Sequence, residues 1–220
     1  MLALLHTSPA HVPVFDALRD EDHPDLELLH LVDESLLARA REHGPEAVAA
    51  DVRSALARAT ADGARAVLCT CSTIGEVAER AAPAVGVPVL RVDRPMAAAA
   101  VAAGERIVVL ATVESTFGPT AALIEREAAG SGRSVTVRTL LADGAWSHFA
   151  AGDTEAYARR IAVVADAVTD ADAIVLAQGS MTPAQALTTT SIPVLSSPRT
   201  GLAAAVVRAS ARGTTGYAGE

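Results

Sequence analysis

Aromatic residues are scarce in this sequence, at 3% of 220 residues, whereas half of all residues are hydrophobic. A core cannot therefore be built around large rings, and aliphatic strands packed against alanine-rich helices are expected instead. The length is sufficient for one large domain or two small ones, each with a real core.

Cysteine is nearly absent as well, since the chain contains only Cys69 and Cys71, which are separated by one residue. A disulfide framework is excluded, and two thiols fit a reducing compartment. The histidines are scattered and none lies near the cysteines in sequence, so no metal-ligand spacing is present. Nucleotide and pyridoxal motifs are missing too, and the sequence predicts neither a metal nor an organic cofactor.

A basic surface is also missing, because the formal net charge is −8 and acidic residues are spread along the chain. This charge argues against nucleic acid or an anionic membrane as a partner. The apolar start Met1–Leu5 lacks a basic segment and is too short for a signal peptide or a membrane span. We expect a soluble, cytoplasmic protein that binds a small molecule.

Short apolar runs alternate with helical patterns along the whole chain. Strands are predicted at Leu2–Leu5, Leu26–Val32, Ala66–Leu68, Val87–Val92, Ile107–Leu110, Val135–Leu141, Ala173–Leu176 and Ile192–Leu195. Helices are predicted at Val12–Arg19, Glu46–Ala61, Pro119–Ala129 and Thr154–Val168, with others beginning near Asp33, Ile74, Pro95 and Gly201. This alternation predicts an α/β fold with mainly parallel sheets that helices cover on both faces.

The pattern occurs twice, which indicates an internal duplication. Leu4–Thr7 matches Val109–Thr112 at an offset of 105 residues, and Val67–Ser72 matches Val175–Ser180 at 108. Val87–Leu90 matches Ile192–Leu195, again at 105. We predict two similar lobes, residues 1–96 (joined by a C-terminal helix over 201–220) and residues 97–200. A pseudo-twofold axis would relate them, with the site in the cleft at that axis.

Cys71 is the strongest candidate for a reactive residue. The apolar run before Cys69 ends in small polar residues, and a helical pattern begins at Ile74. In open α/β folds, ligands bind at this carboxyl edge of the sheet. The N–H groups and the dipole at a helix N-terminus favour an anion, and a thiolate is such an anion. The alternative is that the cysteines are small buried apolar residues, which suits Cys69 better than Cys71.

Hydroxyl and amide side chains recur at the equivalent strand ends of both lobes. Such groups, together with helix N-terminal N–H groups, bind a carboxylate without adding positive charge. Each Ser or Thr alone could also be a simple helix cap, but their recurrence favours ligand binding. The candidates are Thr7, Ser8, Ser72, Thr73, Thr112, Ser115, Thr116, Gln178, Gly179 and Ser180.

These residues carry a family resemblance that extends over almost the whole chain. Cys71-Ser72-Thr73 resembles the Cys-Asn-Thr motif in the first lobe of the aspartate/glutamate racemase superfamily, and Val175–Ser180 lies where the Val-Leu-Gly-Cys-Thr motif of the second lobe belongs. Hydantoin racemases, maleate isomerases and arylmalonate decarboxylase are also members. The resemblance implies a cofactor-independent enzyme, often a dimer, with its site between two lobes. It also implies carboxylate binding by the Thr7-Ser8 and Thr112 loops and a C-terminal helix that returns to the first lobe.

One departure from the family pattern affects the expected chemistry. Racemases of the superfamily use two cysteines, one on each face of the substrate. Here the apolar run places Gln178 at the second cysteine's position, while the internal repeat places Gly179 opposite Cys71. Neither is a thiol, and a glutamine amide can hydrogen-bond an oxygen but does not act as an acid or base near neutral pH. Symmetric racemisation by two thiols is therefore not expected.

Three functions remain open from the sequence. The main hypothesis is a racemase- or isomerase-type reaction at the carbon next to the carboxylate of a small amino or carboxylic acid. Cys71 would be the acid/base or nucleophile, and Gln178 a polar positioning group. The second is a one-cysteine decarboxylase or lyase. The third is a non-catalytic protein that binds a small acid, in which Cys71 only packs. A homodimer or higher homo-oligomer is expected.

Overall fold

The computed structural model describes residues 1–211 and divides into two compact units. Unit 1 consists of Met1–Val92 together with the chain from Pro198, and unit 2 consists of Asp93–Ser197. These limits differ by a few residues from the lobes 1–96 and 97–200 that the sequence predicts. Residues 212–220 of the predicted C-terminal helix lie outside the described residues.

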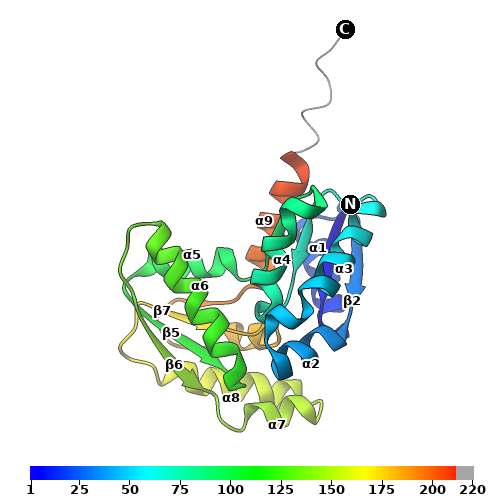
Figure 1. The fold of residues 1–220 in the computed structure, drawn as a ribbon. Coiled ribbons are helices and arrows are strands. Elements are labelled where there is room, and N and C mark those ends of the chain that lie inside the picture. The colour runs from blue at the N-terminus through cyan, green and yellow to red at the C-terminus, as the bar shows by residue number, and fades with distance from the viewer. Residues whose placement is uncertain (212–220) are drawn as a thin grey trace. The chain divides into compact units, whose positions relative to one another are not determined.

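The sheet of unit 1 has four parallel strands in the order β2-β1-β3-β4 (Figure 1). Buried apolar runs form its two central strands, as is typical of parallel sheets with both faces covered. Leu5 of β1 is paired with Cys69 of β3, so the sheet brings the ends of these strands together. The strands are β1 (Leu2–His6), β2 (Leu28–Val32), β3 (Val67–Cys69) and β4 (Val89–Arg91).

Two layers of helices cover this sheet. Alternate side chains of β1 point to opposite faces: Ala3 and Leu5 pack in one cluster, and Leu2 and Leu4 in the other. The first cluster is covered by α2 (Glu34–His43), η2 (Pro45–Val48), α3 (Ala49–Ala61) and α4 (Ser72–Val85). The second is covered by α1 (Val12–Asp22), which follows the short η1 (Pro9–His11), and by α9 (Pro198–Ala211).

Helix α9 completes unit 1 although it lies at the far end of the chain, and Figure 1 shows it in red beside the blue first strand and α1. Leu202 and Ala205 fill the cluster behind Leu4. Gly201 allows α9 to pack closely against Val92, because a Cβ atom at Gly201 would lie 2.5 Å from the carbonyl oxygen of Val92. Arg199 is paired with Glu21 and Asp22 at the end of α1.

Unit 2 repeats the same sheet, with parallel strands in the order β6-β5-β7-β8. Its strands are β5 (Arg106–Ala111), β6 (Thr136–Leu141), β7 (Ala173–Leu176) and β8 (Val194–Leu195). One face packs against α5 (Arg94–Ala103) and α6 (Phe117–Gly130), which follows η3 (Glu114–Thr116). The other face packs against α7 (Ala145–Ala150), α8 (Thr154–Asp166) and η4 (Gly179–Leu187). The predicted α/β fold with two similar parallel sheets is confirmed.

Some predicted elements differ in detail from the structure. The helix predicted over Glu46–Ala61 is split, because η2 ends at Val48 and α3 begins at Ala49. After β7 the chain forms the 3₁₀ helix η4, which contains Pro183, whereas the equivalent position after β3 begins the α-helix α4. Helix α7 was not predicted from the sequence.

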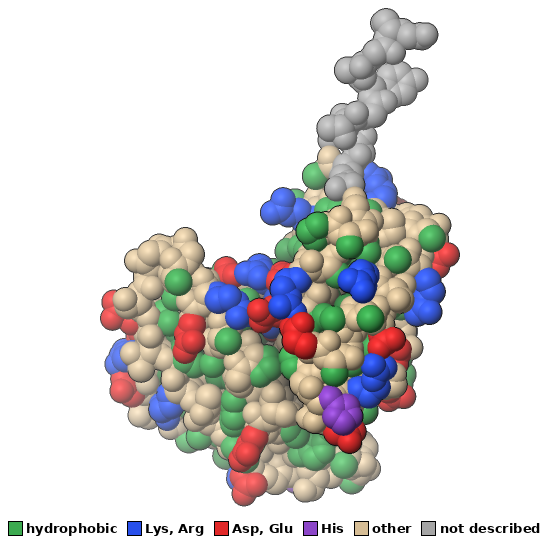
Figure 2. Space-filling view, viewed as in Figure 1, with side chains coloured by type: hydrophobic (Ala, Val, Ile, Leu, Met, Phe, Trp, Pro, Cys, Tyr) green, Lys and Arg blue, Asp and Glu red, His purple; other side chains and the backbone are tan. Residues whose placement is uncertain are grey.

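Acidic and basic side chains are interspersed over the face drawn in Figure 2. Exposed ion pairs within unit 1, such as Arg39 with Asp51 at 2.6 Å, agree with this mixed surface. Exposed pairs of this kind contribute little to stability, typically ~0.2–1 kcal/mol. Among residues 1–211, no helix has the length and apolar character needed to cross a membrane.

Candidate active site

Cys71 and Gln178 occupy equivalent positions in the two units. In unit 1 the N–H of Thr70 donates to the carbonyl oxygen of Leu5 at 3.0 Å, and Cys71 follows as the N-cap residue of α4. In unit 2 the N–H of Ala177 donates to Leu110 at 2.9 Å, and Gln178 follows as the N-cap residue of η4. Of the two positions that the sequence left open, the backbone therefore matches Gln178 to Cys71.

The side chain of Cys71 lies at the start of α4 with no capping hydrogen bond of its own. Its backbone is extended, with φ −112° and ψ 116°, so the chain changes direction at this residue. Cys71 is 8% exposed, whereas Cys69 inside the strand is fully buried. Cys71 also packs in the apolar cluster between the sheet and α4. A thiol in this position lies close to the unpaired N–H groups of the first helical turn.

Arg91 stabilises the turn that carries these N–H groups. Arg91 is 2% exposed, and its Nη2 donates to the carbonyl oxygen of Ser72 at 3.3 Å. Gly75 in α4 leaves room for it, because a Cβ atom there would lie 3.0 Å from Cβ of Arg91. A buried cation thus lies against the first turn of α4.

The other unit 1 candidates surround the same edge of the sheet. Thr7 follows β1 and is 4% exposed. The Ser8 hydroxyl is partly used as a cap, since it accepts a bond from the N–H of Ala10 at 3.4 Å. Ser72 and Thr73 lie half-buried in the first turn of α4. The acidic residue Asp33 is a helix cap, because its carboxylate accepts from the Ser35 N–H at 3.0 Å.

A hydrogen-bonded network orders the equivalent edge of unit 2. Oε1 of Gln178 accepts from the N–H of Thr112 at 2.7 Å and from the Thr112 hydroxyl at 3.0 Å. The carbonyl end of the amide is therefore fixed, and its NH₂ group remains a donor. Ser115 is exposed in η3, whereas Thr116 is buried beside it. Gly179 is the first residue of η4.

Tyr157 belongs to this network and was not predicted from the sequence. Its hydroxyl lies 2.9 Å from Oγ of Ser180 and 3.4 Å from Oγ1 of Thr112, and the residue is 1% exposed. Burial raises the pKa of Tyr157 above its ordinary value, although the bonds with Ser180 and Thr112 act in the opposite direction. Tyr157 therefore keeps its proton at neutral pH. A lone tyrosine on a helix gives no sequence signal for this role.

A second group missed by sequence reasoning lies in unit 1. His6, the last residue of β1, is fully buried and contacts Thr70 and His30 through its two ring nitrogens. Burial, with smaller contributions from His30 and His11, lowers the pKa of His6 to about 3. His6 is therefore neutral at physiological pH. The histidines are far apart in sequence, and only the pairing of β1 with β2 brings them together.

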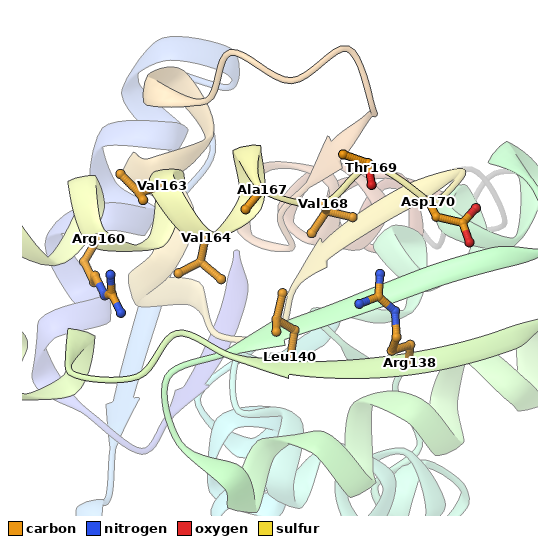
Figure 3. A pocket seen from close by; sticks show the side chains of 9 residues that line it. All are labelled: Arg138, Leu140, Arg160, Val163, Val164, Ala167, Val168, Thr169 and Asp170. Atoms are coloured by element: carbon orange, nitrogen blue, oxygen red, sulfur yellow. The ribbon is translucent and has the colours of Figure 1, made fainter.

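A surface pocket of about 630 Å³ lies in unit 2, away from these residues (Figure 3). It opens between β6 and α8, and Asp170 at its rim is paired with Arg106 at the first residue of β5. None of the predicted site residues lines this pocket. Figure 3 shows Arg138 and Leu140 on β6 below Val164 and Val168.

No cluster of three or more His, Cys, Asp or Glu residues within the described part of the chain is arranged to hold a metal ion. The acidic and histidine side chains near the strand ends bond to protein groups instead, as His6 does to Thr70. The arrangement at the two strand edges offers hydrogen-bond donors, one buried thiol in unit 1 and a buried phenol in unit 2.

The sequence model of the Asp/Glu/hydantoin racemase family matches residues 7–205 of this chain. No curated protein matches the sequence. Among solved structures, aspartate racemase from Picrophilus torridus is similar with a TM-score of 0.70 and 14% identity, over 95% of this chain and 94% of that one. Glutamate racemase from Bacillus anthracis is similar with a TM-score of 0.68 and 15% identity, over 94% of this chain and 80% of that one.

A variant of arylmalonate decarboxylase is similar too, with a TM-score of 0.66 and 21% identity over 95% of this chain and 93% of that one. At these identities the solved structures demonstrate a shared fold. The two-sheet architecture therefore occurs in proteins named as racemases and in one named as a decarboxylase.

Proposed function

Because the chain belongs to the Asp/Glu/hydantoin racemase family, we propose that it catalyses a cofactor-independent racemase- or isomerase-type reaction at the carbon next to a carboxylate. The substrate is a small amino or carboxylic acid, and Cys71 acts as acid/base or nucleophile. The position of Cys71 supports this proposal most strongly: its thiol lies where β3 ends and α4 begins. We further propose that the enzyme is cytoplasmic and a homodimer.

The chemistry follows from the groups at the edge of unit 1. A thiolate accepts the proton from the carbon next to the carboxylate, and negative charge then develops on the carboxylate oxygens. Backbone N–H groups at the start of a helix stabilise such charge without reorganisation. The hydroxyls of Thr7, Ser72 and Thr73 are donors at the same edge and hold the carboxylate in our proposal. Buried Arg91 fixes the turn that presents these groups.

A second candidate function is a decarboxylation or lyase reaction that uses only one thiol. Gln178 favours it, because its Oε1 is held by Thr112 and an amide does not exchange protons near neutral pH. A single acid then protonates a planar intermediate from one side.

Either reaction in deuterated water should place solvent deuterium in the product from one face only. Equal exchange into both enantiomers would require a second acid or base, and Ser180 with Tyr157 would be the first group to mutate.

The decisive experiment is an NMR assay of a panel of amino, dicarboxylic and malonic acids in deuterated water. We expect the native protein to exchange or decarboxylate at least one member, and Cys71→Ser to lose nearly all of this turnover. Cys69→Ser is the matched control, since it removes the neighbouring thiol inside the strand and should keep activity in the folded fraction. The melting temperature of Cys71→Ser should stay within a few degrees of that of the native protein.

The same assay also tests a purely binding function. If an acid of the panel binds but is never exchanged, and Cys71→Ser binds it equally well, then the protein is a binding protein and Cys71 only packs. If Cys71→Ser retains substantial turnover, or if Cys69→Ser is the variant that loses it, then the assignment of the reactive cysteine is wrong.

A further inference from the structure

A continuous chain of hydrogen bonds joins four side chains of unit 1 that the proposed reaction does not use. Oγ1 of Thr70 lies 2.8 Å from Nδ1 of His6, and Nε2 of His6 lies 2.8 Å from Nδ1 of His30. Nε2 of His30 lies 3.2 Å from Oδ1 of Asp16. The inner end, Thr70, precedes Cys71, and the side chain of Asp16 at the outer end is 39% exposed. The chain therefore connects solvent to this strand end.

With Asp16 ionised and His6 neutral, two arrangements of protons satisfy every bond in the chain. In the first, both rings are neutral and all donors point outward. The Thr70 hydroxyl donates to His6 Nδ1, His6 donates through Nε2 to His30, and His30 donates through Nε2 to the Asp16 carboxylate. The carbonyl oxygen of Leu5 still accepts the N–H of Thr70 at 3.0 Å.

The second arrangement contains one more proton. The Thr70 hydroxyl then donates to the carbonyl oxygen of Leu5, 3.2 Å away, and accepts from Nδ1 of His6. His6 accepts at Nε2 from Nδ1 of His30, which is now a cation and still donates to Asp16. One added proton thus reverses the direction of the inner bonds, while His6 remains neutral and changes its tautomer.

The surroundings place the extra charge on His30 and not on His6. Asp16 is the carboxylate that faces His30, and Arg19 lies 3.6 Å from the same oxygen. His6 is fully buried, and the ring of His11 lies 6.2 Å from it, centroid to centroid. Burial and the neighbouring histidines keep the pKa of His6 far below its ordinary value. The Phe15 ring lies 5.6 Å from the His6 ring, centroid to centroid.

Unit 2 demonstrates that the fold does not need this chain. The pairing registers make Ala111 equivalent to His6 and Thr139 equivalent to His30. Ala177 occupies the position of Thr70, and Ala121 that of Asp16 as the fifth residue of its helix. The equivalent four-stranded parallel sheet forms in unit 2 with none of the chain. Burying polar groups is costly unless each is satisfied, so its presence in unit 1 alone indicates a function.

We propose that Asp16, His30, His6 and Thr70 form a reversible one-proton relay that takes up a proton at the strand end bearing Cys71 and holds it on His30, beside the partly exposed Asp16. A proton that reaches Oγ1 of Thr70 displaces the hydroxyl's own proton onto His6 Nδ1, and His6 passes its Nε2 proton to His30. His30 holds the added charge beside Asp16, and return along the same path restores the first arrangement. Bonds between heavy atoms are unchanged throughout. These are positioning residues. That the four residues form a relay does not depend on the proposed function, whereas the purpose of the relay rests on it.

Histidine ring NMR on the native full-length chain tests the relay without any substrate. In protein labelled with ¹⁵N-histidine, we expect His6 to stay neutral from pH 9 to pH 5 and to change from the Nε2–H to the Nδ1–H tautomer. The change should share one midpoint with the protonation of His30. A His6 ring that keeps one tautomer throughout, or that itself becomes the cation in this range, would overturn the proposal.

Two variants, each of which replaces one carboxylate by an amide, test the role of Asp16 in this titration. Asp16→Asn removes the anion that accepts the Nε2–H of His30 and should move the common midpoint to lower pH, as expected for the loss of an opposite charge. Asp20→Asn is the matched control, because Asp20 contacts Arg19 and not the histidines. An unchanged midpoint in Asp16→Asn, in protein that melts as the native protein does, would contradict the role of Asp16. The native titration remains decisive whatever the variants do.

The link to the site is tested by labelling Cys71 with iodoacetamide at different pH values and counting the adduct by mass spectrometry. We expect an inflection in the rate at the midpoint found by NMR, and Thr70→Val should remove it while leaving the His30 titration in place. If the inflection is absent in the native protein, then the chain does not serve the site. If the inflection is present but no acid is ever turned over, the relay stands and the proposed function fails.

Discussion

Gln178 and Thr112 are joined by two hydrogen bonds to a single atom, since Oε1 of Gln178 accepts both the N–H and the hydroxyl of Thr112. The bond from the backbone N–H determines the orientation of the amide, because exchanging its oxygen and nitrogen would set the NH₂ group against this N–H donor. The NH₂ group is left as the donor at the end of β7. The position equivalent to Cys71 thus carries a fixed donor that does not exchange protons.

Installing a thiol in unit 2 should restore acid/base chemistry at only one of the two candidate positions. Gln178→Cys puts the thiol at the position that matches Cys71, whereas Gly179→Cys puts it one residue later, inside η4. We expect Gln178→Cys to increase exchange into the second enantiomer by ~10²-fold or more. Gly179→Cys is the control. Gln178→Asn shortens the side chain and measures how much activity is lost when the hydrogen bond to Thr112 is lost. If neither cysteine variant increases exchange into the second enantiomer, the result counts against the equivalence of Gln178 and Cys71.

Activity should not depend on a metal or an organic cofactor. Exhaustive treatment with EDTA followed by gel filtration is expected to leave the rate of the NMR assay unchanged, because the proposed steps use only side-chain and backbone groups around Cys71. The measurement compares treated and untreated protein at equal concentration. A lost rate that a divalent cation or a small-molecule extract restores would contradict this prediction.

His6 should make unit 1 sensitive to acid. The unfolded chain protonates this residue near pH 6.5, whereas the folded protein does so only at about 3. Between these values the unfolded state binds more protons, so the free energy of unfolding falls as the pH is lowered, by up to about 1.4 kcal/mol per pH unit. Urea unfolding at pH 7.5, 6, 5 and 4 should show a shallower decline in His6→Gln. The exposed His43→Gln should decline as the native protein does.

The close approach of α9 to β4 predicts opposite effects for two glycine substitutions. Gly201→Ala places a Cβ atom 2.5 Å from the carbonyl oxygen of Val92, which the backbone must move to relieve. We expect a loss of about 1–3 kcal/mol in the free energy of unfolding. Gly118→Ala, also in a helix but with no atom within 4 Å, should gain about 0.5–1 kcal/mol. Urea denaturation measures both, and similar values for the two would refute the packing argument.

The fold was predictable because its strands are simple apolar runs. Leu2–His6 and Arg106–Ala111 are buried on both faces of their sheets, and the repeat between them identified two similar units. Elements with weak local signals were not predicted. Helix α7 has only 6 residues, and η4 is a 3₁₀ helix, so neither shows the α-helical periodicity on which such predictions depend.

A residue of the candidate site could be predicted only where the residues next to it in the sequence identify its place in the fold. Cys71 stands out because a strand and a helix meet around it. The partners of Gln178 could not be predicted, since Thr112 lies 66 residues away in sequence and only the pairing of β5 with β7 brings them together. The same holds for His6 and Thr70, which are 64 residues apart. Hydrogen bonds between distant strands require the register, which no short motif encodes.

The position of α9 has a consequence for how the chain acquires its structure during synthesis. The apolar face formed by Leu2 and Leu4 is covered only in part, by Phe15 of α1, until Leu202 and Ala205 of α9 have been synthesised. Unit 2 is continuous in sequence and has no such requirement. Because contacts between distant residues form slowly, the second-made half of the protein can complete its core before the first-made half.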